Sequence, residues 1–365
     1  MGNLLIILLV LCLIVIVLFW YFFHNAFAKI DITTKSEVGI LPPVTVIVCY
    51  KNARQHVLTT IQHLLDQQYH DFELIAIDDF SSDGGSDLLS TVTDPRLILL
   101  KADKDQLGKK GALTQAILKA KNDILLFTDA DCVPSSQNWI KSMTTSMVRQ
   151  KQAEIVLGYG PTNISKGWLN MFIRYETILT AIQYLSYSVS GIPYMGVGRN
   201  LMYRKSLFMR NKGFESHKNI ASGDDDLMIS EVTTAQNTVV NLLKESFVYS
   251  DGKASLTSFL QQKSRHITTS VHYKAKHKYM LGLFAASQLG FYILAIILVI
   301  FGYISINVFV AIYLLKWIIQ MILHHKSFEV LDGRDIRFWF PLMDIGMIIY
   351  YLVLPFYAFI RKEGW

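Results

Sequence analysis

Two acidic residues have a spacing that suits metal binding. Asp129 and Asp131 flank a single alanine directly after the apolar residues 124–127. Alternate side chains of an extended chain point to the same side, so the two carboxylates can hold one hard divalent cation. Mg²⁺ or Mn²⁺ would fit, because such ions take one or two carboxylates together with phosphate oxygens. The alternative is an ordinary Asp-rich turn.

A second acidic pair, Asp78 and Asp79, closes another apolar run and is followed by a Ser- and Gly-rich stretch at 80–85. One of these carboxylates can accept the imide N–H of a uracil base. The alternative is structural, because Asp commonly caps helices and closes Asx-turns.

Three carboxylates stand side by side at Asp224, Asp225 and Asp226. Adjacent like charges repel, which can raise one pKa into the range useful for a general base. Such a base takes the proton of an attacking hydroxyl group. Asp also favours helix N-termini, so the cluster is equally an acidic cap, and both roles are compatible.

Short strands and helices alternate from Pro43 to Tyr159, and this pattern predicts where these residues lie. The expected strands are 44–48, 73–77, 96–100 and 123–128, with helices at 57–67 and 111–120. Such alternation predicts a mostly parallel sheet covered on both faces. Ligands of these sheets bind beyond the carboxyl ends of the strands, where Asn52, Asp78 and Asp129 are expected.

The hydrophobic residues, 52% of the chain, are concentrated at its two ends. About 20 apolar residues cross a bilayer core about 30 Å thick. Four segments meet or approach this length: 4–23, 281–304, 307–323 and 340–360. The first has a rival interpretation as a signal peptide, but its long apolar run and uncharged start favour an anchor.

Basic residues indicate the orientation. Lys326, Arg334 and Arg337 lie between the third and fourth segments, and such loops are typically cytosolic. Each membrane crossing changes the side of the membrane. Counting crossings back from this loop therefore places 24–280 in the cytosol. Arg361 and Lys362 oppose a simple fourth span and instead fit a last segment that re-enters the membrane.

Charge and cysteine content narrow the class of protein. The net charge of +6 is not gathered into an arm, so no nucleic-acid partner is expected, and the bias suits anionic membrane lipids. The three cysteines have no spacing typical of a disulfide framework or a metal site. Residues 168–187 and 258–279 are predicted to lie in the membrane interface, and the alternative for 168–187 is a buried core helix. Lys316 and Asp344, inside apolar spans, are expected to face protein or a polar cavity.

Six motifs in a fixed order give the sequence a family resemblance. They are residues 44–52, 77–84, 108–113, 128–134, 198–204 and 222–227. Over about 43–272 the chain resembles membrane-bound family 2 glycosyltransferases with the GT-A fold, including bacterial enzymes related to cellulose and hyaluronan synthases. The resemblance implies inverting transfer from a nucleotide-sugar, usually UDP-linked, with a divalent cation, Mg²⁺ or Mn²⁺.

The resemblance also implies roles for individual residues on the donor side. The expected donor contacts are Asn52, Asp78, Asp79, Lys109, Asp129, Gln262 and Arg265. Asp79 would contact the nucleobase. Asp131 would be the principal metal ligand, with Asp129 beside it at the ribose or the donor sugar.

Alignment on Leu227 makes Asp224 the expected catalytic base. Gly223 replaces the family's usual Glu, which leaves Asp225 as a rival base. Residues 262–266 resemble the Gln-x-x-Arg-Trp motif, in which Arg265 would hold the leaving diphosphate. His266 stands where the motif has Trp, and this departure weighs against processive polymer synthesis.

The sequence as a whole predicts an α/β, Rossmann-like GT-A catalytic domain with N-terminal and C-terminal transmembrane helices. The expected parts are an anchor (1–24), the GT-A domain (25–255), an interfacial segment (256–280) and a transmembrane region (281–365). The expected function is transfer of a sugar to a lipid-linked acceptor at a bacterial cell membrane. The alternatives are a small processive polysaccharide synthase, with a glycan acceptor and partner subunits, and a catalytically silent scaffold.

Overall fold

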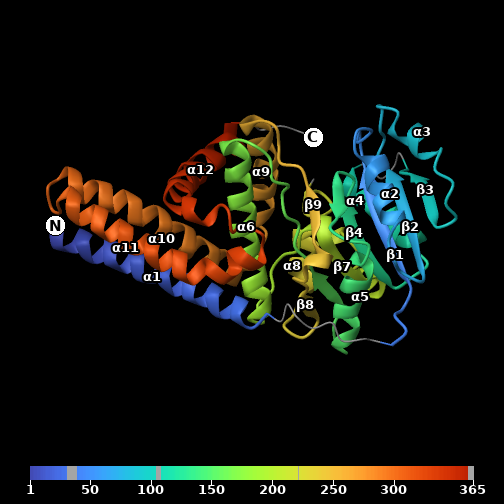
Figure 1. Cartoon of the computed structure of the whole chain (residues 1–365), viewed down its shortest axis with the longest axis horizontal. Coiled ribbons are helices and arrows are strands. Elements are labelled where there is room, and N and C mark those ends of the chain that lie inside the picture. Colours follow the sequence, from blue (N-terminus) through green and yellow to red (C-terminus); the bar gives the residue numbers. More distant parts are fainter. Residues whose placement is uncertain (31–38, 104–107, 221, 361–365) are drawn as a thin grey trace. The chain divides into compact units, whose positions relative to one another are not determined.

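The computed structural model describes residues 1–30, 39–103, 108–220 and 222–360 (Figure 1). These residues form two compact units. The α/β unit contains the described residues from Ile30 to Ser165 and Tyr187–Ala254. The helical unit contains Met1–Lys29, Lys166–Ser186 and the chain from Ser255 onward.

The α/β unit is built on a seven-stranded sheet with the order β3-β2-β1-β4-β7-β6-β8. Its strands are β1 (Val44–Tyr50), β2 (Phe72–Asp78), β3 (Leu97–Lys101), β4 (Ile124–Asp129), β6 (Ile155–Leu157), β7 (Leu201–Arg204) and β8 (Thr238–Val240). A separate two-stranded sheet pairs β5 (Cys132–Pro134) with β9 (Val248–Ser250). β1 runs parallel to both β2 and β4, whereas β7 is antiparallel to its neighbours. The register sets Cys49 of β1 opposite Ile77 and Asp129, so the polar strand ends meet at one edge.

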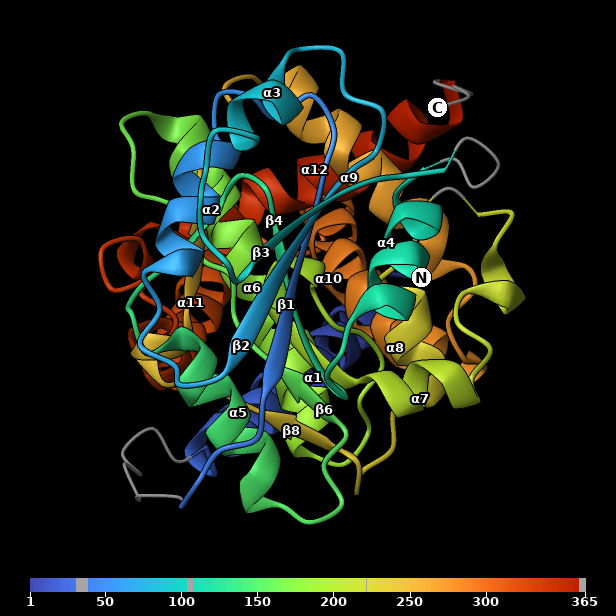
Figure 2. The same ribbon diagram turned by 90° about the vertical axis from the view of Figure 1, so that its right-hand side faces the viewer.

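Helices cover both faces of this sheet, which explains why β1 and β2 are apolar on both sides. The helices of the unit are α2 (Val57–Leu65), α3 (Gly85–Leu89), α4 (Lys109–Lys119), α5 (Trp139–Arg149), α7 (Lys205–Arg210) and α8 (Asp226–Val232). α2 and α5 share a buried cluster with alternate residues of β1 and β2, and α4 packs on the opposite face (Figure 2). Short 3₁₀ helices lie at Gly198–Asn200, Glu215–His217, Lys244–Ser246 and Arg337–Trp339. The four predicted strands and the parallel sheet are confirmed.

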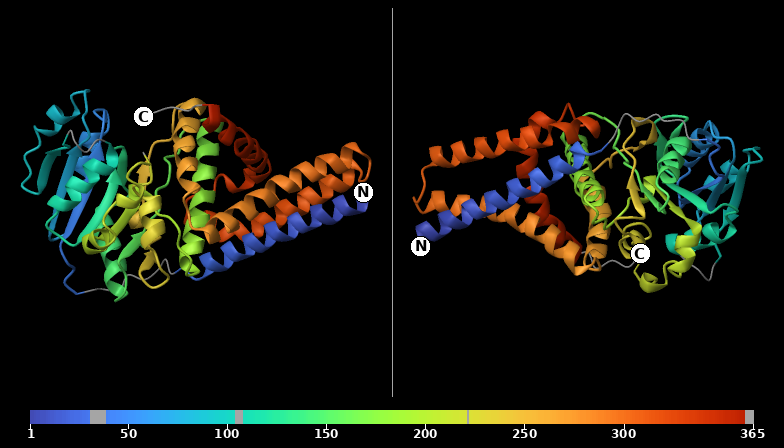
Figure 3. Two further views of the ribbon diagram at one scale, coloured as in Figure 1. Left: turned by 180° about the vertical axis from the view of Figure 1, so that it is seen from behind. Right: turned by 90° about the horizontal axis from the view of Figure 1, so that it is seen from below.

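The helical unit contains four helices that are long and apolar enough to cross a membrane: Gly2–Ala28, Ala275–Ile300, Ile306–Val330 and Arg337–Ile360. The first three are α1, α10 and α11, and α12 (Phe340–Ile360) forms most of the fourth. α1 packs along both α10 and α11 (Figures 1 and 3). Contacts mark both ends of this bundle: Gly2 lies against Tyr303, and His24 Nδ1 lies 3.0 Å from the Leu323 carbonyl oxygen.

α12 does not run alongside that bundle but packs with α6 (Trp168–Val189) and α9 (Leu256–Ser270) (Figures 1 and 3). Rings of Phe172 on α6 and Phe259 on α9 both meet the Tyr350 ring of α12. α12 is continuous, with Pro355 inside it. Arg361 and Lys362, which bear on its topology, lie outside the described residues.

The structure bears on three expectations. The segment 168–187, assigned to the catalytic domain, belongs to the helical unit through residue 186 because its aromatic face packs on α12. The interfacial segment 256–280 is divided, since α9 ends at Ser270 and α10 begins at Ala275. Lys316 and Asp344 form an ion pair, with Nζ and Oδ2 2.7 Å apart, as buried intramembrane charges require.

Candidate active site

The carboxyl end of β4 carries a compact group of possible metal ligands. Asp129 ends β4 and Cys132 begins β5, so Asp131 lies in the tight turn between them. One ligand atom from each of these three residues lies within 4.8 Å of the other two. Burial raises the pKa of the Cys132 thiol well above its usual value, so the thiol remains protonated. The two carboxylates, which are 39% and 43% exposed, are therefore the ligands that suit a hard cation.

Lys109, the first residue of α4, connects two of the acidic groups. Its Nζ lies 3.1 Å from Asp129 Oδ1 and 3.0 Å from Asp224 Oδ2. Burial by itself lowers the pKa of Lys109, but the carboxylates of Asp129, Asp224 and Asp225 outweigh it and hold that pKa well above its usual value. Lys109 is therefore a permanent cation between the strand end and the acidic cluster. A cavity of about 330 Å³ is lined by all four residues.

The three adjacent carboxylates have different environments. Asp225 is the N-cap of α8: its Oδ2 accepts from the Gly198 N–H and its Oδ1 from the Asp226 N–H, both at 2.7 Å. Burial, and then repulsion by Asp224, raise the pKa of Asp225 to about 7. Asp226 is buried, and its Oδ1 accepts from the Leu227 N–H. Asp224, with 13% of its side chain exposed, forms the ion pair with Lys109, and it lines the cavity together with Asp225.

The structure explains the glycine that departs from the family pattern. Gly223 has a φ of +95°, a left-handed conformation that side chains disfavour. A Cβ added there would lie 2.5 Å from Leu227 Cδ1. Glutamate therefore does not fit at this position, and the backbone turn that presents Asp224 depends on glycine.

The two carboxylates at the end of β2 differ in their hydrogen bonding. Asp78 has a structural role, and Asp79 has an oxygen that can accept from a ligand. Asp78 Oδ1 accepts from the Ser81 N–H at 2.8 Å and Oδ2 accepts from the Ser86 hydroxyl at 2.6 Å, so Asp78 holds the following loop. Asp79 is buried, and its Oδ1 has no hydrogen-bond partner among the described residues. Its Oδ2 lies 3.7 Å from Lys51 Nζ. Asp79 thus offers the open acceptor that an N–H of a base requires.

Asn52 is exposed and holds the same loop through its side-chain oxygen and its backbone N–H. Its Oδ1 accepts from the Ser82 N–H at 2.8 Å, and its own N–H donates to the Ser81 hydroxyl. Its predicted role in donor binding remains a prediction, acting through the loop. Gln262 and Arg265 lie on α9 of the helical unit. They are not part of the cluster that the α/β unit builds from its own residues.

Sequence reasoning overlooked two positioning residues. The Lys110 ammonium donates to the carbonyl oxygens of His217 and Ile220, both at 2.8 Å, and so holds the segment that leads to Asp224. Asn200 is fully buried; its Nδ2 donates to the Tyr159 and Ser246 carbonyls. Both residues lie inside motifs of the sequence, Lys110 in 108–113 and Asn200 in 198–204. Their residue types alone do not indicate which segments they connect.

Residues 45–210 match the family model described as Glycosyl transferase family 2. The α/β unit belongs to the family 2 glycosyltransferases. The match runs from β1 to α7 and includes Asp79, Lys109, Asp129 and Asp131, and it ends before Asp224.

Curated family 2 relatives are bacterial. The chain is 24% identical over 139 residues to the Escherichia coli UDP-Glc:alpha-D-GlcNAc-diphosphoundecaprenol beta-1,3-glucosyltransferase WfaP, covering 38% of this chain and 50% of the relative. It is 32% identical over 92 residues to the putative teichuronic acid biosynthesis glycosyltransferase TuaG of Bacillus subtilis, covering 25% and 36%. The chain thus spans about half or less of the length of these relatives.

Among solved structures, the mannosyltransferase PcManGT from Pyrobaculum calidifontis, determined in complex with GDP-Man and Mn²⁺, has a similar fold. The TM-score is 0.65 at 16% sequence identity, and the match covers 100% of both chains. This confirms the fold predicted for the family 2 glycosyltransferase unit, a GT-A sheet accompanied by hydrophobic helices.

Proposed function

We propose that this protein is an inverting glycosyltransferase that moves a sugar from a UDP-linked nucleotide-sugar to a lipid-linked acceptor at a membrane. The observation that carries the proposal is the position of Lys109 between Asp129 and Asp224 at the carboxyl end of the sheet. That arrangement joins a metal-binding strand end to a carboxylate able to act as base. The family of the α/β unit supplies the reaction class.

On the donor side, Asp131 and Asp129 would hold Mg²⁺ or Mn²⁺. A bound divalent cation neutralises the charge that develops on a departing diphosphate. Lys109, permanently charged at the start of α4, adds a cation at a helix N-terminus, where anions are stabilised. The Asp79 Oδ1 would accept the imide N–H of uracil. A relative named for UDP-Glc and a structural neighbour holding GDP-Man and Mn²⁺ support a nucleotide-sugar with a metal.

On the acceptor side, Asp224 would take the hydroxyl proton as the hydroxyl oxygen attacks C1 of the sugar and the bond from C1 to the diphosphate breaks. A single displacement of this kind inverts the anomeric centre. Asp225 suits this role less well because both of its oxygens accept backbone N–H groups. A diphosphate would offer Lys109 a further anionic partner besides Asp129 and Asp224. That partner would weaken the ion pair with Asp224 at the stage when the base must act.

The membrane arrangement is part of the proposal. α1, α10 and α11 would span a bacterial cell membrane, with Ala28 and Lys326 at the same end of their bundle, where Lys326 Nζ approaches the Ala28 carbonyl. The positive-inside rule places that end, and the catalytic unit that follows α1, in the cytosol. The packing of α1 against the later helices supports an anchor over a cleaved signal peptide. The lipid diphosphate in the name of the WfaP relative supports a lipid-linked acceptor.

A panel assay tests this function. The full-length protein in lipid nanodiscs is incubated with UDP- and GDP-sugars, Mn²⁺ or Mg²⁺, and a bacterial lipid extract, and the products are identified by mass spectrometry and NMR. We expect one or a few sugars on a lipid, with inverted anomeric configuration. Asp71→Asn, an exposed change at the opposite end of β2, should match the wild type, whereas Asp224→Asn should form no product.

The same assay distinguishes the alternatives. Long polymers would establish the processive synthase, against which His266 in place of Trp already weighs. Absence of both nucleotide binding and transfer with every sugar tested would establish the silent scaffold. Retained configuration at the anomeric carbon would reject the single displacement with Asp224 as base.

A further inference from the structure

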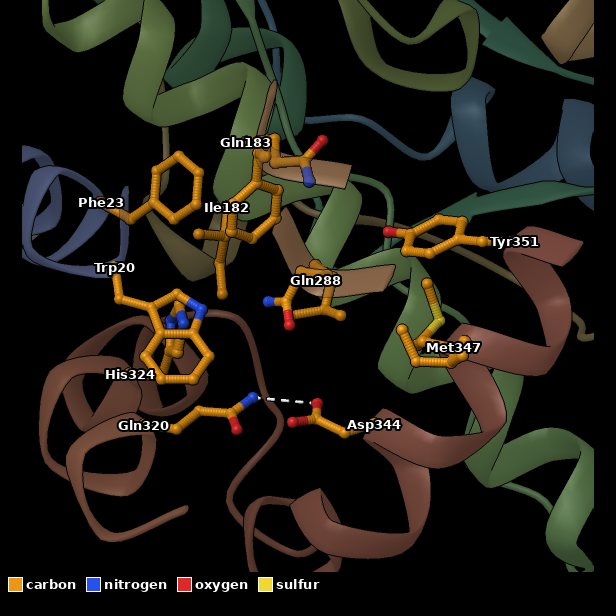
Figure 4. Close-up of a pocket in the computed structure, with 13 residues that line it drawn as sticks. Trp20, Phe23, Ile182, Gln183, Gln288, Gln320, His324, Asp344, Met347 and Tyr351 are labelled. Carbon is orange, nitrogen blue, oxygen red and sulfur yellow. Dashed lines mark hydrogen bonds between the residues drawn. The ribbon is translucent and has the colours of Figure 1, made fainter. Parts of the chain in front are cut away.

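A pocket in the helical unit has no place in the proposed reaction. Residues of α1, α6, α10, α11 and α12 line this pocket (Figure 4). Its polar lining residues are Gln183, Gln288, Gln320, His324, Asp344 and Tyr351. All five helices belong to the one compact unit.

α11 contributes a polar row to a helix that is otherwise suited to lipid. Lys316, Gln320 and His324 follow each other at intervals of four residues, so they share one helix face. Each is at most 2% exposed, although α11 is apolar enough to cross a membrane. Polar side chains at membrane depth are costly and mark functional sites unless partners satisfy them.

The protein itself provides partners for the Lys316 ammonium and for the Gln320 amide nitrogen. Lys316 Nζ donates to Asp344 Oδ2 at 2.7 Å. Asp344 Oδ1 accepts from the Tyr175 hydroxyl at 2.6 Å and from Gln320 Nε2 at 3.0 Å. The ion pair is therefore neutral overall, and both Asp344 oxygens are hydrogen-bonded, as a structural pair requires.

His324 is not satisfied in this way. Within the described part of the chain, neither of its ring nitrogens has a hydrogen-bond partner, and Gln320 Oε1 also lacks one. The His324 ring lies among the rings of Trp20, Phe23 and Phe340. An unpaired buried polar group destabilises the fold, and phenylalanine would suit these aromatic neighbours better. A ligand that occupies the pocket would supply the missing hydrogen bonds.

The lining determines the charge of that ligand. It includes one carboxylate, Asp344, which Lys316 already neutralises, and it includes neither Lys nor Arg. A phosphate head would find no cation here and would meet Asp344. A hydroxyl group both donates and accepts, which matches an imidazole and side-chain amides. The apolar lining by Phe23, Ile182 and Phe284 suits an acyl chain.

The position of the pocket indicates where the ligand comes from. Trp20 and Phe23 belong to the last third of α1, close to the end at which His24 meets Leu323. In a spanning bundle this end lies near the membrane surface, where lipid heads are found. We propose that the pocket binds the head of a neutral, hydroxyl-bearing lipid such as a diacylglycerol. The proposal concerns binding and does not depend on glycosyl transfer.

Native mass spectrometry of the full-length protein tests this proposal with three probes: dioleoylglycerol, dioleoyl phosphatidic acid and free glycerol. The two lipids share acyl chains and differ in the head, and glycerol has the hydroxyls without the chains. We expect dioleoylglycerol to bind at least tenfold more tightly than either of the other two. Equal or tighter binding of phosphatidic acid would reject the neutral head, and equal binding of glycerol would reject a lipid.

The variant His324→Phe separates a ligand site from a structural histidine. We expect it to weaken dioleoylglycerol binding at least tenfold while the thermal midpoint of the unliganded protein stays the same or rises. Gln261→Leu, an exposed change on α9 outside the pocket, is the matched control and should leave binding unchanged. Gln288→Leu provides a second test from α10 and should also weaken binding. Unchanged dioleoylglycerol binding in both pocket variants would overturn the proposal.

Discussion

Asp224 and Asp225 are adjacent carboxylates, and replacing each by Asn should affect different properties of the protein. Asp224 pairs with Lys109, whereas Asp225 caps α8 through Oδ1 and accepts the Gly198 N–H with Oδ2. The amide preserves the shape of the side chain but cannot accept a proton. Asp224→Asn should therefore abolish transfer and leave the fold intact, and Asp225→Asn should weaken the fold and leave most of the transfer.

The magnitudes follow from these contacts. Loss of a general base costs about 10²–10⁴-fold in rate, or roughly 2.7–5.4 kcal/mol in activation free energy. For Asp224→Asn the change in unfolding free energy should stay within about 1 kcal/mol, because its ion pair is partly exposed. In Asp225→Asn one backbone N–H, of Gly198 or Asp226, faces an amide NH₂, and a buried unsatisfied donor costs about 1–3 kcal/mol. For a domain of about 200 residues that lowers the thermal midpoint by about 2–12 °C.

Asp225 should also make stability depend on pH. Its pKa is raised to about 7 in the folded protein, above the ordinary value of 3.8. Between these values the folded state holds a proton that the unfolded state has lost, so this group's contribution to stability is present near pH 4 and is lost as pH rises through 7. Asn does not titrate. The stability difference between the wild type and Asp225→Asn should therefore be largest at pH 5 and smallest at pH 8.

The assay is the transfer rate at saturating donor, measured below the midpoint of either variant, together with donor affinity and thermal midpoints at pH 5 and pH 8. If Asp225→Asn is inactive while folded and Asp224→Asn is nearly normal, the alignment on Leu227 is wrong by one residue. If both variants keep transfer, the base lies elsewhere and the acidic cluster only caps α8.

Three further predictions concern the metal, the membrane pair and the topology. Asp131→Ala should abolish turnover and weaken Mn²⁺-dependent UDP binding in calorimetry; wild-type turnover in excess chelator would contradict the metal role. Asp344→Asn should cost about 3–5 kcal/mol in thermal unfolding because it leaves the Lys316 ammonium buried and unpaired, and Lys316→Met with Asp344→Leu should restore most of that stability. A cysteine at the exposed Lys151 should react with an impermeant maleimide only after cells are lysed, and reaction in intact cells would reverse the orientation.

The strands and the acidic strand ends could be predicted from the sequence because their signals are local. Buried apolar runs such as 44–48 and 124–127 end in polar residues, and parallel strands bring those ends together. The resemblance to family 2 glycosyltransferases rested in addition on the order of the six motifs. The structure and the similarity in fold confirm the strands, and the roles of the acidic strand ends remain predictions.

The remaining features depend on partners distant in the chain. The two N–H donors that fix Asp225 include Gly198, 27 residues away, and nothing in either segment indicates the pair. Asp78 and Asp79 read alike in sequence, yet only the fold shows that Ser81 and Ser86 use both oxygens of Asp78. Likewise, the periodicity of 168–187 predicts an apolar face but does not say which helix covers it.

The contact between His24 and Leu323 joins residues 299 positions apart, and it sets the order in which the chain can be assembled. A ribosome adding roughly 5–20 residues per second needs about 15–60 s between the end of α1 and the end of α11. During that interval α1 is without its partners α10 and α11, while the α/β unit has already emerged and can fold. The helical unit is thus completed last, from three separate stretches of chain, and non-local contacts of this kind form slowly. A chain cut short before α10 would carry a finished sheet on an unpartnered helix, and such a product is a natural substrate for membrane quality control.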